Sequence, residues 1–304
     1  MSEVIMMKIG IIGGGSIGLL YAFYLNKQHE VTLYVRSDEQ KDIISLEGIF
    51  LNKKENRRNE RIHVEYIHNW KGQDEITFVA VKEYHLDTLL ATLSIHTKTL
   101  FIFLQNGMGH LEKLERLKNQ QVYIGTVEHG ALKVNKNEVN HTGLGVTKLA
   151  PLTENAEPIQ LSNVMANSED FPFMLYQNYE DIMLKKLVAN AVINPLTAIL
   201  KIRNGLLIED PSYFKVFKIL FTEVTAALSI KDSQEIEAYV VSICRKTAHN
   251  QSSMFKDIVE GRKTEVDAIV GYCLTQANKN QESVPLLTSC YFMIKGMEKK
   301  GEKD

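Results

Sequence analysis

The chain is poor in cysteine and in metal-ligand clusters, and both shortages exclude classes of protein. Its 304 residues contain three cysteines, Cys244, Cys273 and Cys290. They are widely spaced in segments of helical pattern, so we expect small buried hydrophobic residues in a reducing cytosol, not a disulfide framework. The nine histidines form no H-E-x-x-H motif and no Cys/His ligand spacing. We therefore predict no metal site.

Long apolar runs and an excess of one charge are also missing. No apolar run approaches the roughly 20 residues that a membrane-spanning helix needs. The opening MSEVIMM lacks the basic region and apolar stretch of a secretory signal. A formal net charge of −2 gives no electrostatic reason to expect a nucleic acid or a membrane surface as partner. We expect a cytoplasmic protein, and a homodimer is one of the assemblies that the sequence leaves open.

The first half of the chain has the pattern of an α/β fold. Short apolar runs alternate with helical stretches, as in βαβ units, and are rich in Val, Ile, Leu or Phe, as strands covered on both faces should be. The expected strands are Lys8–Ile12, Val31–Val35, Ile76–Val81, Leu100–Leu104 and Val122–Thr126. We predict a Rossmann-type, doubly wound, mostly parallel sheet in residues 1–168. The polar segment Gly48–His68 is interpreted as a solvated turn between short strands, and Ala131–Leu149 as an irregular β-rich extension.

The second half is helical in pattern. Long segments with a period of 3.6 residues predict an all-α domain over residues 169–304. The expected helices are Tyr179–Leu200, Pro211–Leu228, Ser233–Thr247, Thr264–Asn278 and Leu286–Met297, followed by a frayed tail, EKKGEKD. A cleft between the two domains is the expected place for chemistry.

A glycine motif at the end of the first strand predicts a dinucleotide site. Lys8–Ile12 runs into Gly13-x-Gly15-x-x-Gly18, and a helical segment follows. Gly13 permits a tight turn, Gly15 lets the backbone approach a pyrophosphate, and Gly18 lets the helix pack on the strand. Ser16 and Ile17 complete the loop, where free N–H groups at the helix N-terminus face the phosphates.

The end of the second strand indicates which nicotinamide cofactor is held. An acidic residue there binds the ribose of NAD, whereas an arginine accommodates the 2′-phosphate of NADP. The position holds Arg36, and Ser37 can add a hydroxyl donor. Asp38 and Glu39 offer the alternative of an NAD site or of ion pairs with Arg36. We predict NADP(H).

Polar residues follow two more strands. Lys82 comes after Ile76–Val81, and Asn106 after Leu100–Leu104. Ligands of an open parallel sheet bind beyond the carboxyl ends of its strands, so both residues are placed to contact cofactor or substrate. For either residue alone, a solvent-exposed loop position is the ordinary reading.

Two helical-domain segments carry candidate catalytic residues. Lys186, Asn190 and Asn194 lie along one stripe of an otherwise apolar helix. Two explanations are equally good: the three side chains contact a polar ligand, or the asparagines cap loops and the lysine extends to water. Asn250 and Ser253 have the alternative of being turn residues. Thr264 and Asp267 resemble a capping box that would place Glu265 in the first turn of a helix.

The constellation resembles the ketopantoate reductase (2-dehydropantoate 2-reductase) family over nearly the whole chain. The resemblance is carried by GGGSIG, VAVK, QNGMG, KKLVANAVINPLTA, RNG, NQSSM and KDIVEGRKTEVDAIVG. It implies a C-terminal domain like that of 6-phosphogluconate dehydrogenase. It also implies NADPH-dependent reduction of a small 2-keto acid, ketopantoate, to pantoate in pantothenate and coenzyme A biosynthesis.

The resemblance also implies roles for single residues. Lys186 matches the catalytic lysine and Glu265 the carboxylate that pairs with it or with the substrate. Substrate-binding positions match Asn106, Asn190, Asn194, Asn204, Asn250 and Ser253, and Asn106, Lys82 and Arg36 match cofactor contacts. Glu128 and His129 depart from the family pattern and put fine substrate preference in question. The alternatives are a related reductase of another 2-keto or 3-hydroxy acid, and a non-catalytic NADP(H) sensor.

Overall fold

A computed structural model describes residues 5–93, 97–154, 156 and 169–301. Its contacts divide the chain into two units. The first comprises Met1–Gln105 and Glu112–Ile182, and the second comprises Asn106–Leu111 and Met183–Asp304. The boundary expected after residue 168 falls at the edge of a segment outside the described residues.

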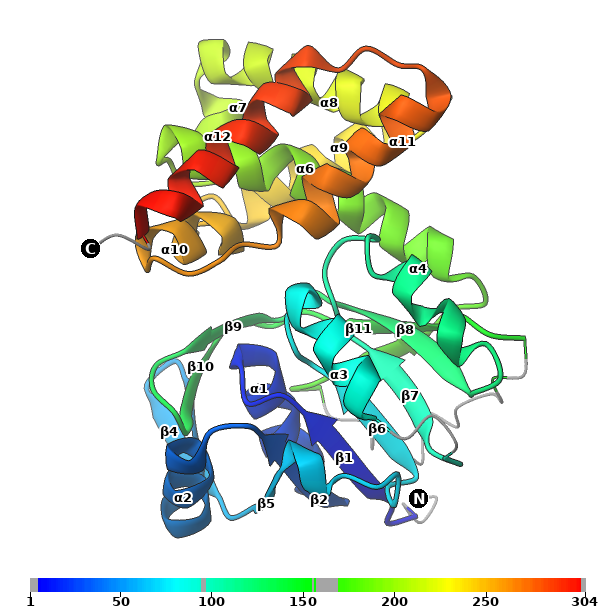
Figure 1. The fold of residues 1–304 in the computed structure, drawn as a ribbon. Helices are drawn as coiled ribbons and strands as arrows, with labels where there is room; N and C mark the ends of the chain where they lie inside the picture. Colours follow the sequence, from blue (N-terminus) through cyan, green and yellow to red (C-terminus); the bar gives the residue numbers. More distant parts are fainter. Residues whose placement is uncertain (1–4, 94–96, 155, 157–168, 302–304) are drawn as a thin grey trace. The chain divides into compact units, whose positions relative to one another are not determined.

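The first unit is built on a sheet of eight strands (Figure 1). In spatial order these are β12 (Phe173–Leu175), β11 (Thr147–Pro151), β8 (Val122–Val127), β7 (Leu100–Phe103), β6 (Ile76–Val79), β1 (Lys8–Ile12), β2 (Glu30–Val35) and β5 (His63–Tyr66). The six strands from β8 to β5 are parallel, β11 is antiparallel to β8, and β12 is parallel to β11. This is the strand order of a Rossmann fold, as predicted.

Apolar strands and an apolar helix explain why this sheet forms the core. All four residues of β6 and of β7 are buried, because helices cover both faces of a doubly wound sheet. Residues 18–25 of the first helix are likewise all buried. The helices of this part are α1 (Ser16–Leu25), α2 (Asp38–Glu47), α3 (Leu86–Thr92) and α4 (Leu111–Leu114), with single turns η1 (Ile67–Asn69), η2 (Glu83–His85) and η3 (Glu115–Leu117).

A second, smaller sheet corrects the interpretation of Gly48–His68. Its order is β4 (Asn56–Glu60), β3 (Ile49–Lys53), β10 (Glu138–Gly143) and β9 (Gly130–Lys133). The polar KKENRRNE segment belongs to a β-hairpin of β3 and β4, in which the turn at Lys54–Glu55 and most of the edge strand β4 are exposed. The strand pattern was hidden because an edge strand needs little apolar sequence. The β-rich extension predicted for Ala131–Leu149 is confirmed.

The second unit is helical in its described residues. Its elements are most of α6 (Tyr179–Leu200), whose first four residues group with the first unit, then α7 (Leu206–Glu209), α8 (Pro211–Ala227), α9 (Gln234–Lys246), α10 (Ser253–Val259), the π-helical turn η4 (Asp267–Gly271), α11 (Tyr272–Asn280) and α12 (Pro285–Gly301). The short helices α7 and α10 were not predicted. The prediction of a frayed tail from residue 298 is wrong for its first residues, because α12 continues to Gly301. Residues 302–304 lie outside the described part.

Helix α6 contains Pro195 and yet is continuous over 22 residues. By length and composition it could cross a membrane, but 72% of its most apolar window is buried inside the protein. Such burial is typical of a core helix. The three cysteines are free and buried, as expected.

Candidate functional site

The glycine loop after β1 has the backbone geometry of a dinucleotide-binding turn. Gly13 has a φ of 116°, a conformation that side chains rarely adopt, and its N–H donates to the Tyr34 carbonyl at 2.9 Å. At Gly18, an added Cβ would lie 1.7 Å from the Gly13 carbonyl oxygen. Both glycines are therefore required by the fold itself.

Gly15 is different, because nothing in the fold requires it to be glycine. Its φ of −82° suits any residue, and an added Cβ would meet no atom within 4 Å. The residue caps α1 without a side-chain hydrogen bond. Ser16 and Ile17 then form the first turn, where backbone N–H groups lack partners within the helix. The open space over these N–H groups is what the close approach of a phosphate needs.

The glycine loop is held by hydrogen bonds from two side chains that the sequence analysis did not identify, Gln40 and Lys133. Gln40 of α2 donates through Nε2 to the Gly14 carbonyl at 2.8 Å and to the Lys136 carbonyl at 2.7 Å. Lys133 of β9 also donates to the Gly14 carbonyl, and its backbone N–H donates to Ser16 Oγ at 3.1 Å. The loop is thus held by α2 and by the edge of the small sheet.

Arg36 lies directly after β2 and is exposed. It forms no ion pair among the described residues. Ser37 is the N-cap of α2 and accepts from the Gln40 N–H, so its hydroxyl proton can still be donated. Glu39 forms an ion pair with Lys136, not with Arg36. Asp38 helps to raise the pKa of Tyr66, an effect in which desolvation is the larger cause.

Lys82 is half-buried and precedes the turn η2, beyond the carboxyl end of β6. It therefore keeps the position predicted for a cofactor contact.

The loop after β7 groups with the helical unit. Asn106 donates through Nδ2 to Glu265 Oε2 at 3.0 Å, which joins a predicted cofactor contact to the predicted catalytic carboxylate. The N–H groups of Met108 and Gly109 both donate to the Ala268 carbonyl. An added Cβ on Gly107 would lie 2.1 Å from that oxygen, so the loop packs tightly on the π-helical turn. Turns of this kind are frequent at functional sites.

The predicted capping box at Thr264 is wrong in its details. Thr264 Oγ1 accepts from the Val266 N–H, while the Thr264 N–H donates to Glu298 of α12 at 2.8 Å. The Asp267 carboxylate accepts from Tyr291 and Lys295. The helix starts after Glu265, which is 7% exposed, so this carboxylate is held before the first turn and not within it.

The stripe of Lys186, Asn190 and Asn194 exists, because all three residues lie on the regular helix α6. Asn194 is buried, whereas Lys186 and Asn190 are half-buried. Lys185, the neighbouring lysine, forms an ion pair with Glu235 at 2.6 Å.

The remaining predicted substrate contacts differ in exposure. Asn250 and Ser253 are exposed. Asn204 is buried and donates to Thr247 Oγ1 at 2.9 Å, and its N–H donates to the Asn250 carbonyl at 3.0 Å. Ser252 is the N-cap of α10 and accepts from Thr197 Oγ1. Asn204 therefore has a structural task that spacing alone did not indicate.

The two departures from the family pattern are occupied by local contacts. Glu128 pairs with Lys148 at 2.6 Å. His129 is buried and stacks on Phe171 at a ring distance of 4.5 Å, next to His141. Both side chains thus have a structural role in the first unit.

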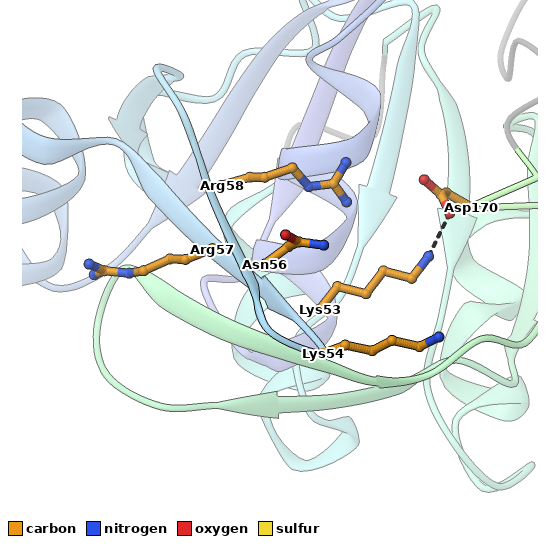
Figure 2. A pocket seen from close by; sticks show the side chains of 6 residues that line it. All are labelled: Lys53, Lys54, Asn56, Arg57, Arg58 and Asp170. Atoms are coloured by element: carbon orange, nitrogen blue, oxygen red, sulfur yellow. Dashed lines mark hydrogen bonds and ion pairs between the residues drawn. The ribbon is translucent and has the colours of Figure 1, made fainter.

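A basic pocket of about 370 Å³ lies at the β3–β4 hairpin (Figure 2). Lys53, Lys54 and Arg58 extend toward the side of Asp170, whereas Arg57 points the other way. Lys53 pairs with Asp170, and Arg57 pairs with Glu138 at 3.3 Å. The pocket is at the opposite edge of the small sheet from β9, the strand that contacts the glycine loop. None of the predicted site residues lines it.

Two family models match the chain. Residues 9–154 match the family described as ketopantoate reductase PanE/ApbA, and residues 178–298 match ketopantoate reductase PanE/ApbA C terminal. The chain is 38% identical over 299 residues to the 2-dehydropantoate 2-reductase of Bacillus subtilis (strain 168), which covers 98% of this chain and 99% of that relative.

Solved structures agree with this match. The crystal structure of a probable 2-dehydropantoate 2-reductase from Bacillus subtilis has a TM-score of 0.87 at 37% identity, covering 96% of this chain and 100% of that one. A D-mandelate dehydrogenase, solved with NADH and anilino(oxo)acetate, has a TM-score of 0.87 at 22% identity, covering 98% and 100%. The second similarity shows a shared fold.

Proposed function

Because the chain belongs to the ketopantoate reductase PanE/ApbA family, we propose that it reduces the C2 ketone of 2-dehydropantoate to pantoate with NADPH. The reaction is a step of pantothenate and coenzyme A biosynthesis. Its support is a relative that bears this name at 38% identity, together with Lys186, Glu265 and Asn106, which the sequence resemblance matches to site residues of the family.

The observation that carries the cofactor proposal is the open space over Gly15. This glycine is not required by backbone conformation or by packing, so the residue fits a loop that a pyrophosphate approaches closely. Gly13 and Gly18 shape the turn, and the N–H groups of Ser16 and Ile17 bind the phosphates. When bound, the nicotinamide supplies the hydride.

We assign the choice of NADPH over NADH to Arg36. Its guanidinium is exposed at the end of β2 and can bind the 2′-phosphate bidentately, with the Ser37 hydroxyl as a further donor. Glu39 is neutralised by Lys136, which reduces its repulsion of a phosphate. Lys82 and Asn106 complete the proposed cofactor contacts.

In this proposal Lys186 is the proton donor. Its ammonium hydrogen-bonds the ketone oxygen, stabilises the negative charge that appears there during hydride transfer, and protonates the alkoxide. Glu265, held by the Asn106 amide, orients the lysine or the substrate hydroxyl. Asn190, Asn194, Asn250 and Ser253 supply neutral hydrogen bonds to the substrate's carboxylate and primary hydroxyl, and Asn204 supports the Asn250 backbone.

The test is a steady-state assay of NADPH oxidation with a panel of short 2-keto acids that includes ketopantoate. The proposal expects the highest kcat/KM with ketopantoate. A higher value for another 2-keto acid would assign the enzyme to that substrate. Tight NADPH binding without turnover of any acid would favour the non-catalytic sensor.

Location and assembly follow as proposals of the same kind. Three buried free thiols suit a reducing cytoplasm. A homodimer remains a prediction, which analytical ultracentrifugation of the purified chain would check.

A further inference from the structure

Lys133 is a cation in an unexpected place, beside the glycine loop. It ends β9, is half-buried, and donates from Nζ to the Gly14 carbonyl oxygen at 2.8 Å. Its backbone N–H donates to Ser16 Oγ at 3.1 Å. Both contacts join the lysine to the turn between β1 and α1, the segment to which the proposed function assigns the phosphates.

The charge of this lysine is not balanced by a carboxylate in the described part of the chain. Burial, and to a lesser degree the nearby charge of Lys136, lowers the pKa of Lys133. Lys136 itself is paired with Glu39. A partly buried ammonium without a counter-charge is unfavourable, so the native fold keeps Lys133 at a cost that an anionic ligand would relieve.

The ammonium also has hydrogen-bonding capacity to spare. It carries three protons, and the Gly14 carbonyl accepts one of them. The Ser16 hydroxyl accepts from Lys133 N–H and can still donate its own proton. These donors lie around the same loop as the open position at Gly15.

We propose that Lys133 binds the pyrophosphate of the dinucleotide and supplies the positive charge that the glycine loop itself lacks. The proposal rests on the proposed cofactor binding and goes beyond it, because it assigns a phosphate contact to the small sheet. A charge-assisted hydrogen bond to phosphate is worth about 10- to 100-fold in affinity. Since NADH and NADPH share the pyrophosphate, the lysine serves both.

A purely structural role for Lys133 makes a different prediction, and Gln40 separates the two. Gln40 Nε2 donates to the same Gly14 carbonyl at the same 2.8 Å but carries no charge. If the lysine merely holds the loop, Gln40→Met and Lys133→Met would have similar effects. If its charge matters, only loss of the lysine changes how salt affects binding.

The experiment measures Kd for NADPH and for NADH by fluorescence titration of the full chain at several salt concentrations. We expect Lys133→Met to weaken both cofactors by about 10- to 100-fold and to flatten the salt dependence. Lys133→Arg should restore most of the affinity. Lys118→Gln removes one exposed positive charge elsewhere in the first unit and is the matched control, expected to match the wild type.

Three results would overturn the proposal. These are Kd values within twofold of the wild type, a loss confined to NADPH, or equal salt dependence in Lys133→Met and Gln40→Met. Lys133→Gln replaces the methionine variant if that variant does not fold. Turnover of ketopantoate is measured separately on the wild type, so failure of the proposed reaction is distinguishable from failure of the lysine's role.

Discussion

Arg36 is the side chain on which the proposed cofactor preference depends. Replacing it by aspartate removes the phosphate-binding guanidinium and adds a carboxylate that repels the 2′-phosphate. We expect Arg36→Asp to weaken NADPH about 100-fold or more and NADH by much less. Equal losses for the two cofactors would contradict the role. Arg116→Asp, an exposed change of the same charge, is the control for the net-charge effect.

Lys186 is the side chain on which the chemistry depends. We expect Lys186→Ala to lower kcat about 10²-fold or more, because the alkoxide loses its proton donor, while Kd for NADPH changes little. Lys185→Ala is a matched control on the same helix, since this lysine is paired with Glu235. Unchanged turnover in Lys186→Ala would remove the residue from the mechanism.

At the residue scale, sequence reasoning located side chains better than it assigned their tasks. The pairing of Asn106 with Glu265 could not be predicted, because 159 positions separate them in sequence. Lys133 and Gln40 carry no local motif, and only the fold brings them to Gly14. Asn204 differs from these residues, because it was predicted as a ligand contact and its side chain donates a hydrogen bond to Thr247 within the protein.

The turn from β1 to α1 allows the structural and ligand-binding tasks of glycine to be separated. Gly18→Ala forces a Cβ onto the Gly13 carbonyl and should cost about 2–4 kcal/mol of unfolding free energy. Gly15→Ala meets open space, so the protein should fold normally and bind dinucleotide more weakly. Urea denaturation and cofactor titration measure the two effects.

Gly296 provides the control for this series. It lies within α12, and an added Cβ would meet nothing within 4 Å. Gly296→Ala should therefore stabilise the protein by about 0.5–1 kcal/mol through helix propensity alone. Normal stability of Gly18→Ala would show that the tight contact of α1 with the loop is not needed.

At the scale of elements, long periodic segments were predictable and short ones were not. Helix α6 has the predicted bounds, and the buried strands differ from prediction by two residues or fewer at each end. Helix α10 depends on a cap from Ser252 and has only seven residues, too few to show a period. Strand β4, NRRNE, is polar because it lies at a sheet edge.

Stability of the whole molecule against acid should depend on His129. Burial, with a smaller effect from the charges of His141 and Lys53, lowers the pKa of His129 to about 4. In the unfolded chain the pKa is about 6.5, so the unfolded state binds the proton first as the pH falls. The ring is neutral in the fold, and the Gly145 N–H donates to its Nδ1. Stability is thus full above pH 6.5 and falls between about pH 6.5 and 4.

The variant His129→Gln tests this dependence. The wild type should lose up to about 3 kcal/mol of unfolding free energy over that interval, and the variant distinctly less. Urea denaturation at a series of pH values measures both. Parallel curves for the two proteins would show that other groups, such as His141, dominate acid unfolding.

The loop Asn106–Leu111 lies between two strands of the sheet in sequence, but its contacts group it with helices that follow much later. A fragment that ends at Ile182 would therefore contain this loop without Glu265 and the Ala268 carbonyl, the groups to which the loop is hydrogen-bonded. During synthesis on the ribosome, the loop cannot form these hydrogen bonds until Glu265 and Ala268, which lie in the last third of the chain, have been made. The hydrogen bond between the Asn106 amide and the Glu265 carboxylate can therefore form only after most of the chain has been synthesised.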